Sequence, residues 1–246
     1  RTGETTLIHT MGKIKPSRVL VAGLGPQDKF DVHVVRRVSA EAVRFLRRKG
    51  ISSAATIAHG AGIGGLDPQL SGQAIAEGAH LGLYKFGTYL TKNSDSTNEF
   101  EHLTVVESDK TRAKAIDAGI QLGSTVAKAS ITARNMVNEP ANHMTPSRMA
   151  EAAQKVASDQ GLKIEIMENA QMKNMGMGAF MGVAQGTDEP AKLIVLRYDG
   201  DPENPENNLG LIGKGITFDT GGISLKPPGG MEAMKGDMAG GASVIA

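Results

Sequence analysis

The sequence predicts an α/β protein of two domains joined by a long helix. Short apolar runs alternate with helical patterns in the first part of the chain, an uninterrupted helical pattern covers 111–136, and the alternation restarts at Pro146. We therefore expect a smaller amino-terminal α/β domain over 1–109, a connecting helix over 110–138 and a second α/β domain with a mixed sheet over 139–246.

The amino-terminal domain is expected to alternate strands with two helices. Apolar runs bounded by turn residues predict strands at 18–24, 51–58 and 102–107. Apolar residues at helical spacing predict a helix over 32–49, which Gly50 ends. Asp67 and Pro68 predict the start of a second helix that runs to about Leu83, because proline is tolerated in a first turn.

The second domain shows the same kind of pattern. Its expected elements are a helix at 146–159, a strand at 163–167, a Met- and Gly-rich helix or loop at 170–182, and strands at 192–198 and 209–213. A turn-rich stretch with two prolines, 199–208, separates the last two strands.

Composition excludes several classes of protein. The 246 residues include 27 basic and 26 acidic ones, so no strong overall field selects nucleic acid or an anionic membrane. The absence of cysteine excludes disulfides and thiolate metal sites. No run reaches the ~20 apolar residues of a membrane span, and no signal peptide is recognisable. We expect a cytoplasmic location, and both ends, including Arg1, are expected to be internal to a longer chain.

A glycine-rich stretch after the last predicted strand concentrates chemistry-bearing side chains. Lys214, Asp219, Lys226 and Asp237 fall within 24 residues. Ligands of open α/β sheets bind beyond the carboxyl ends of strands, and two carboxylates suit hard or borderline divalent metals. A neighbouring lysine can ligate as a neutral amine or stabilise an oxyanion. From the residues alone, solvated lysines and capping aspartates stay an open alternative.

The same stretch resembles the signature of a known family. Ile212–Pro227, followed by Met234–Ala242, resembles the leucyl aminopeptidase family of two-metal exopeptidases almost word for word. Val137–Pro146 and Gly178–Pro190 resemble further blocks of its catalytic domain, so the resemblance implies that 139–246 is the first half of a catalytic metallopeptidase domain. Fainter likeness to its amino-terminal domain covers Arg18–Gly25 and Gln73–Phe86.

The resemblance implies a role for each of five residues. It implies that Asp219 bridges two divalent metal ions, which zinc, manganese or magnesium would suit, and that Lys214 and Asp237 ligate the tighter-bound one. It implies that Lys226 is the catalytic cation that polarises the scissile carbonyl and contacts substrate. It implies that Met234 lines the pocket for the first side chain of the substrate.

The departure from the family bears on activity. The family's second motif, Asn-Thr-Asp-Ala-Glu-Gly-Arg, does not occur in this sequence. One metal would then keep three protein ligands, and the other only Asp219. The resemblance implies peptide substrates with leucine-like first residues and a homo-hexameric full-length parent. We expect the 246-residue chain alone to be inactive and the parent to be active.

Two other functions are weighed against the peptidase. The predicted helix over 32–49 carries six cations, which suits a DNA-binding or regulatory module as well as a solvated helix face: Arg36, Arg37, Arg44, Arg47, Arg48 and Lys49. Phe218–Gly221 matches the aspartic protease triplet, but that chemistry needs two such aspartates. Only a homodimer would supply the second.

Overall fold

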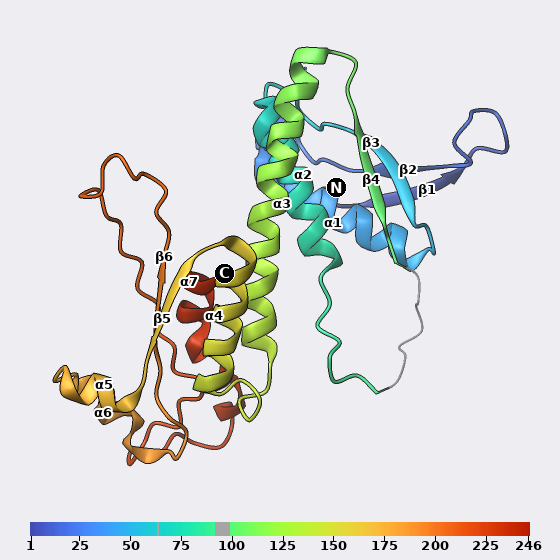
Figure 1. The fold of residues 1–246 in the computed structure, drawn as a ribbon. Coiled ribbons are helices and arrows are strands. Elements are labelled where there is room, and N and C mark those ends of the chain that lie inside the picture. The colour runs from blue at the N-terminus through green and yellow to red at the C-terminus, as the bar shows by residue number, and fades with distance from the viewer. Residues whose placement is uncertain (63, 92–98) are drawn as a thin grey trace. The chain divides into compact units, whose positions relative to one another are not determined.

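The chain forms two compact α/β units. The computed structural model describes residues 1–62, 64–91 and 99–246. The units are Arg1–Ile131 and Thr132–Ala246 (Figure 1). Strands and helices alternate in both, which confirms the predicted class. Helix α3 (Lys110–Asn138) belongs partly to each unit, so the domain limits at 109 and 139 stay a prediction.

The first unit contains a hairpin, a parallel strand pair and a pair of packed helices. Its elements before α3 are β1 (Thr5–His9), β2 (Arg18–Ala22), η1 (Gln27–Lys29), α1 (Val32–Arg48), β3 (Ser53–Ile57), α2 (Pro68–Leu83) and β4 (His102–Val106). β1 pairs antiparallel with β2, and β3 pairs parallel with β4. All predicted elements of this unit are confirmed. β1 is not among them, because its short, half-polar sequence becomes a strand only by pairing with β2.

Sequence signals at the helix ends work as expected. The Asp31 carboxylate accepts a hydrogen bond from Val34 N at 2.9 Å and starts α1, and Asp67 accepts from Leu70 N at 3.0 Å and starts α2. Val35 of α1 and Ile75 of α2 are buried in the core of this unit. The two helices therefore form one layer against which the strands pack.

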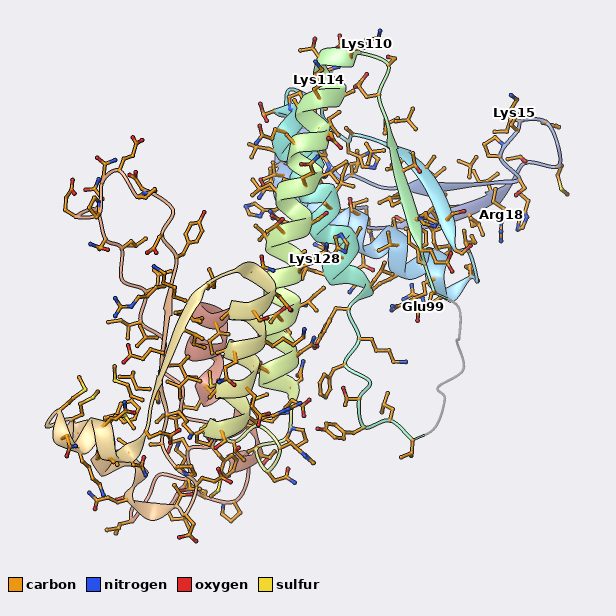
Figure 2. The ribbon with its side chains drawn as sticks, viewed as in Figure 1. Lys15, Arg18, Glu99, Lys110, Lys114 and Lys128 are labelled. Carbon is orange, nitrogen blue, oxygen red and sulfur yellow. The ribbon has the colours of Figure 1, made fainter. Side chains whose placement is uncertain are left out.

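Helix α3 covers the 110–138 range predicted for the connecting helix. It contains 29 residues, with Ile116 and Ala127 buried at helical spacing. Figure 2 shows Lys110, Lys114 and Lys128 spaced along it. No helix in the described ranges combines the length and apolarity needed to cross a bilayer.

The second unit combines an antiparallel strand pair with helices. Its elements are α4 (Pro146–Gln160), β5 (Lys163–Met167), α5 (Asn169–Asn174), α6 (Gly178–Val183), η2 (Ala184–Gly186), β6 (Leu193–Arg197), η3 (Met231–Met238) and α7 (Ala239–Ile245). β5 and β6 pair antiparallel. Within the described residues, this one pair represents the mixed sheet expected there. The predicted helix or loop at 170–182 is two short helices, α5 and α6.

The strand predicted at 209–213 is wrong. The segment has no strand partner in the described part of the chain, and Leu209, Leu211 and Ile212 are largely exposed. An apolar run becomes a strand only where a second edge satisfies its peptide groups. The segment instead leads directly into the candidate site at Lys214.

A methionine-rich core supports the end of the second unit. Met149 of α4 and Met238 of η3 are buried in one cluster with Met136, Met144 and Ile245. Unbranched methionine side chains fill irregular gaps, which suits contacts between short helices. The cluster fixes η3 and α7 on α4, and η3 carries two of the predicted site residues.

Candidate metal centre

The backbone at Lys214 is held against the start of α7. Gly241 N donates a hydrogen bond to Lys214 O at 2.7 Å. A Cβ on Gly213 would lie 2.4 Å from Gly240 O, so only glycine permits this approach. Residues 213–215 and 240–241 are therefore fixed side by side, although they are far apart in sequence.

Lys214 and Asp237 form the first ion pair of the site. Lys214 Nζ donates to Asp237 Oδ1 at 2.9 Å and lies 2.7 Å from Oδ2. Oδ2 is buried, and the angle of approach leaves it without a hydrogen bond. Because Met238 is fixed in the core, the adjacent Asp237 of η3 is held in position beside Lys214.

Lys226 and Asp219 form the second ion pair. Lys226 Nζ donates to Asp219 Oδ2 at 2.6 Å and lies 3.1 Å from Met234 Sδ. Gly221 N donates to Asp219 Oδ1 at 2.9 Å. The Lys226 side chain is about one-third exposed, so its ammonium remains accessible. The predicted catalytic cation and the predicted pocket methionine are thus in contact.

The two ion pairs influence each other electrostatically. The hydrogen bond from Lys226, followed by that from Gly221 N, holds the pKa of Asp219 below its usual range. The hydrogen bond to Asp237 raises the pKa of Lys214, and the charge of Asp219 adds to the rise. Asp219 is thus among the groups that act on Lys214, which links the two ion pairs electrostatically.

The donor set fits a divalent cation in part. Two carboxylates and one potential amine ligand match the oxygen-rich sites of Mn²⁺, Mg²⁺ and Zn²⁺, and the buried Asp237 Oδ2 faces the Lys214 amine at 2.7 Å. Among the described residues, no group of three or more His, Cys, Asp or Glu side chains could hold a metal ion. A second cation would need further donors.

The structure adds supporting residues that sequence reasoning missed. Lys235 Nζ donates to Asn138 O at 2.7 Å and attaches η3 to the end of α3. Met149 packs against Gly241, because a Cβ on Gly241 would be 2.8 Å from Met149 Cε. The Gly240-Gly241 doublet was the available signal for this close packing.

Most cations of helix α1 have partners within the first unit. Arg36 is paired with Glu77, Arg44 pairs with Glu41 at 2.6 Å, and Arg47 donates to Leu83 O at 2.7 Å. Lys49 lies over the Phe45 ring at 5.7 Å. These contacts favour a structural role for the helix, and nucleic-acid binding stays an untested prediction.

The α/β fold and a centre of two lysine–carboxylate pairs define the class: an α/β protein with a candidate metal centre. The chain belongs to the cytosol aminopeptidase family. The family's amino-terminal domain model matches residues 1–93, and its catalytic domain model matches residues 131–246.

Curated relatives and solved structures agree with this assignment. The chain is 41% identical over 243 residues to a probable cytosol aminopeptidase of Alkaliphilus oremlandii, covering 99% of this chain and 48% of the relative. It is 34% identical over 246 residues to a probable cytosol aminopeptidase of Pseudomonas aeruginosa, covering 100% of this chain and 49% of the relative. Its structure is similar to that of the bottromycin maturation enzyme BotP in complex with Mn, with a TM-score of 0.84 and 31% sequence identity. The match covers 100% of this chain and 49% of the BotP chain.

The matched length sets the limit of the comparison. The chain spans about half the length of the curated relatives it matches. Its fold and family follow from the matches.

Proposed function

We propose that the polypeptide to which this chain belongs is a metal-dependent aminopeptidase that releases amino-terminal residues from peptides, preferring leucine-like side chains. One observation carries the proposal: the structure pairs all four charged candidates with one another, Lys214 with Asp237 at 2.7 Å and Lys226 with Asp219 at 2.6 Å. The relatives named as probable cytosol aminopeptidases support the reaction. The manganese complex of BotP supports a divalent cation.

Each side chain of the centre has a proposed role. Asp219, Asp237 and Lys214, the last as a neutral amine after losing its proton, would hold the metal ions. When bound, divalent cations supply a nucleophilic water near neutral pH and polarise the scissile carbonyl. The Lys226 ammonium would bind the oxyanion that develops on that carbonyl. Met234, in contact with Lys226 Nζ, would line the pocket for an apolar first side chain.

The chain alone would hold one cation better than two. Lys214, Asp219 and Asp237 would ligate one ion. The second ion would have only Asp219, which it shares with the first. We therefore expect little turnover from the isolated chain. We propose a cytoplasmic location and a homo-hexameric parent on the family resemblance.

Titration of the isolated chain with Mn²⁺ by calorimetry tests the metal centre. We expect binding that weakens at least about tenfold in Asp237→Asn, because a charged ligand is lost. Asp159→Asn is the matched control, since Asp159 pairs with Lys155 on α4, outside the centre. Equal affinities in the two variants would remove Asp237 from the ligand set.

Hydrolysis of a leucine chromogenic amide tests the activity. We expect turnover by the parent polypeptide with Mn²⁺ and little by the 246-residue chain. Comparing leucine with lysine and glutamate amides tests the side-chain preference. A parent that binds metal yet cleaves none of these amides would contradict the proposed reaction.

A further inference from the structure

Helix η3 has two sides with different surroundings. It is a 3₁₀ helix, Met231–Met238, and side chains three positions apart lie on the same side of such a helix. Met234 and Asp237 are one pair with this spacing, and Lys235 and Met238 are the next. The first pair contacts the two lysines of the candidate site. The second pair therefore lies on a different side of the same helix.

Both members of the second pair contact the end of α3. Met238 is fully buried in a cluster that includes Met136 of α3. Lys235 Nζ donates a hydrogen bond at 2.7 Å to the carbonyl oxygen of Asn138, the last residue of α3. Lys235 and Asn138 are 97 positions apart in sequence, so the hydrogen bond joins two distant segments. One apolar contact and one polar contact thus hold η3 to the same helix end.

The two contacts constrain η3 in different ways. Apolar burial has no preferred direction, whereas a hydrogen bond weakens steeply as its angle departs from linear. The last carbonyls of an α-helix lack donors within the helix, and the helix dipole favours a cation beside them. The bond from Lys235 to Asn138 O is part-buried, which limits competition from water. Met238 thus holds η3 on the core, and Lys235 fixes its rotation about its own axis.

We infer that Lys235 is a positioning residue of the candidate metal centre, which sets the places of Met234 and Asp237 together through its hydrogen bond to Asn138 O. The inference rests on the proposed function, because it assigns Lys235 to the support of the proposed pocket methionine and the proposed metal carboxylate. A rotation of η3 moves both groups, since they share one side of the helix. Loss of the bond should therefore misplace two groups and remove neither.

Methionine methyl resonances of the metal-free 246-residue chain test this geometry. Lys235→Leu removes the donor and keeps most of the alkyl chain. We expect it to shift the Met234 methyl resonance by more than its linewidth, because that side chain moves relative to the Lys226 ammonium. The resonance of the buried Met238 should stay in place. Lys235→Arg should restore the Met234 resonance, because its guanidinium can donate to the same carbonyl. Equal shifts of both methionines would mean that η3 loosens as a whole, which would overturn the inference.

Metal affinity provides a second readout. By calorimetry on the 246-residue chain, we expect Mn²⁺ binding to weaken about tenfold in Lys235→Leu and less than about twofold in Lys235→Arg. Lys192→Leu is the matched control, since Lys192 pairs with Glu168 in the same unit and neither belongs to η3. An equal loss of affinity in Lys192→Leu would attribute the effect to general destabilisation and contradict a positioning role.

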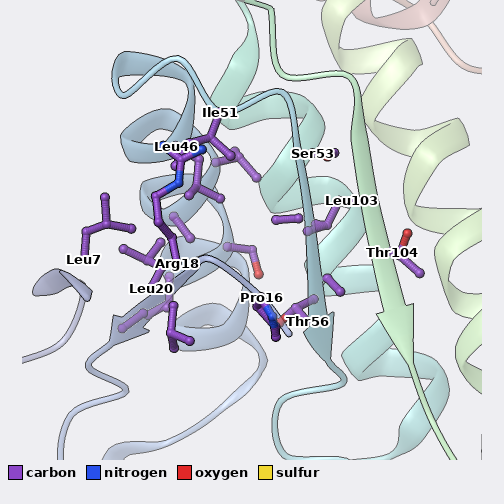
Figure 3. A pocket seen from close by; sticks show the side chains of 18 of the residues that line it. Leu7, Pro16, Arg18, Leu20, Leu46, Ile51, Ser53, Thr56, Leu103 and Thr104 are labelled. Atoms are coloured by element: carbon purple, nitrogen blue, oxygen red, sulfur yellow. The ribbon is translucent and has the colours of Figure 1, made fainter. Parts of the chain in front are cut away.

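A destabilising variant of the first unit is a further control. Leu46→Ala truncates a buried side chain in a groove of about 630 Å³ (Figure 3). The described residues that line this groove all lie between Leu7 and Thr104, whereas η3 lies in the second unit. We expect Leu46→Ala to lower the Tm of the chain and to leave the Met234 resonance and the Mn²⁺ affinity unchanged. A shifted Met234 resonance in this variant would show that the resonance reports stability and not the rotation of η3.

Side-chain preference in the parent polypeptide reports the place of Met234. At saturating Mn²⁺, Lys235→Leu should lower the ratio of kcat/KM for a leucine amide to that for an alanine amide at least about fivefold, mainly through KM. Lys192→Leu should leave this ratio unchanged. An equal fall of kcat/KM for both amides in Lys235→Leu would indicate a purely structural role and overturn the inference.

The readouts separate this inference from the proposed function. If the unmodified chain binds no Mn²⁺ and the parent cleaves no amide, the proposed function fails, and the methyl resonances of the metal-free chain decide the role of Lys235. If Lys235→Leu does not fold, Lys235→Gln, whose side chain is one bond shorter than that of lysine, takes its place in the same measurements. An unchanged Met234 resonance in the folded variant would overturn the inference.

Discussion

At the residue scale, the site depends on one close backbone approach. Lys214 and Asp237 are 23 positions apart in sequence and meet at 2.7 Å because Gly213 and Gly241 let two segments touch. The ion pair therefore depends on the backbone path of these two segments as well as on the two charged side chains.

The close contact between Gly213 and Gly240 can be tested by substitution. Gly213→Ala should lower the free energy of unfolding by about 1–3 kcal/mol, because the new Cβ would overlap Gly240 O. Gly210→Ala is the control, since a Cβ there meets nothing within 4 Å. Urea unfolding of the two variants measures the difference, and coincident curves would show that the loop relaxes without cost.

The ammonium of Lys226 has a predicted catalytic effect. In the parent polypeptide, Lys226→Ala should lower kcat about 100- to 1,000-fold, because an oxyanion-binding cation is lost. The control is Lys173→Ala, an exposed lysine on α5. Steady-state kinetics on a leucine amide provide the measurement, and a change confined to KM would instead assign Lys226 to ground-state binding.

Glu107 gives the first unit a specific pH dependence. Hydrogen bonds from Asp109 N, from the Arg112 guanidinium and from Ser108 N lower the pKa of Glu107 from 4.5 to about 2. Because the folded pKa is the lower one, this stabilisation is present above pH 4.5 and is lost as the pH falls towards 2.

Unfolding at two pH values tests this dependence. Glu107→Gln should have a lower urea midpoint than the unmodified chain at pH 6, and the gap should narrow towards pH 2.5 as the native carboxylate loses its advantage. Glu101→Gln, an exposed acid just before β4, is the control. A gap that stays constant with pH would mean that packing, not ionisation, explains the effect.

At the element scale, η3 and α7 act as one anchored element. Met238, where the two meet, is fully buried in the core formed with α4, while its neighbour Asp237 faces the site. Packing on one side of this element therefore sets the position of the carboxylate on the other side.

Truncating Met238 should weaken that anchor. Met238→Ala is expected to destabilise the second unit by about 2–5 kcal/mol, because it leaves a cavity in a closed core. Met175→Ala, at a methionine that is 62% exposed, should change stability by less than about 0.5 kcal/mol. Thermal unfolding compares the two variants, and similar losses would show that the core collapses around the truncation.

The elements that could be predicted from sequence are those with strong local signals. Asp31, Asp67 and Thr145 cap three predicted helices, and buried apolar residues recur along α1 and α3. β1 was missed and 209–213 was wrongly predicted for one reason. A strand depends on a partner edge elsewhere in the chain, which local pattern does not reveal.

At the scale of the whole molecule, residue types and family motifs determined the α/β class, the family and the four charged candidates of the site. Only the tertiary structure decided that Lys214 pairs with Asp237 and Lys226 with Asp219, and that Asp237 Oδ2 is left without a hydrogen bond. It also revealed the hydrogen bond from Lys235 to Asn138 O. The physical reason is that propensity and motif act over neighbouring residues, whereas ion pairs and contacts between helices depend on packing between distant segments.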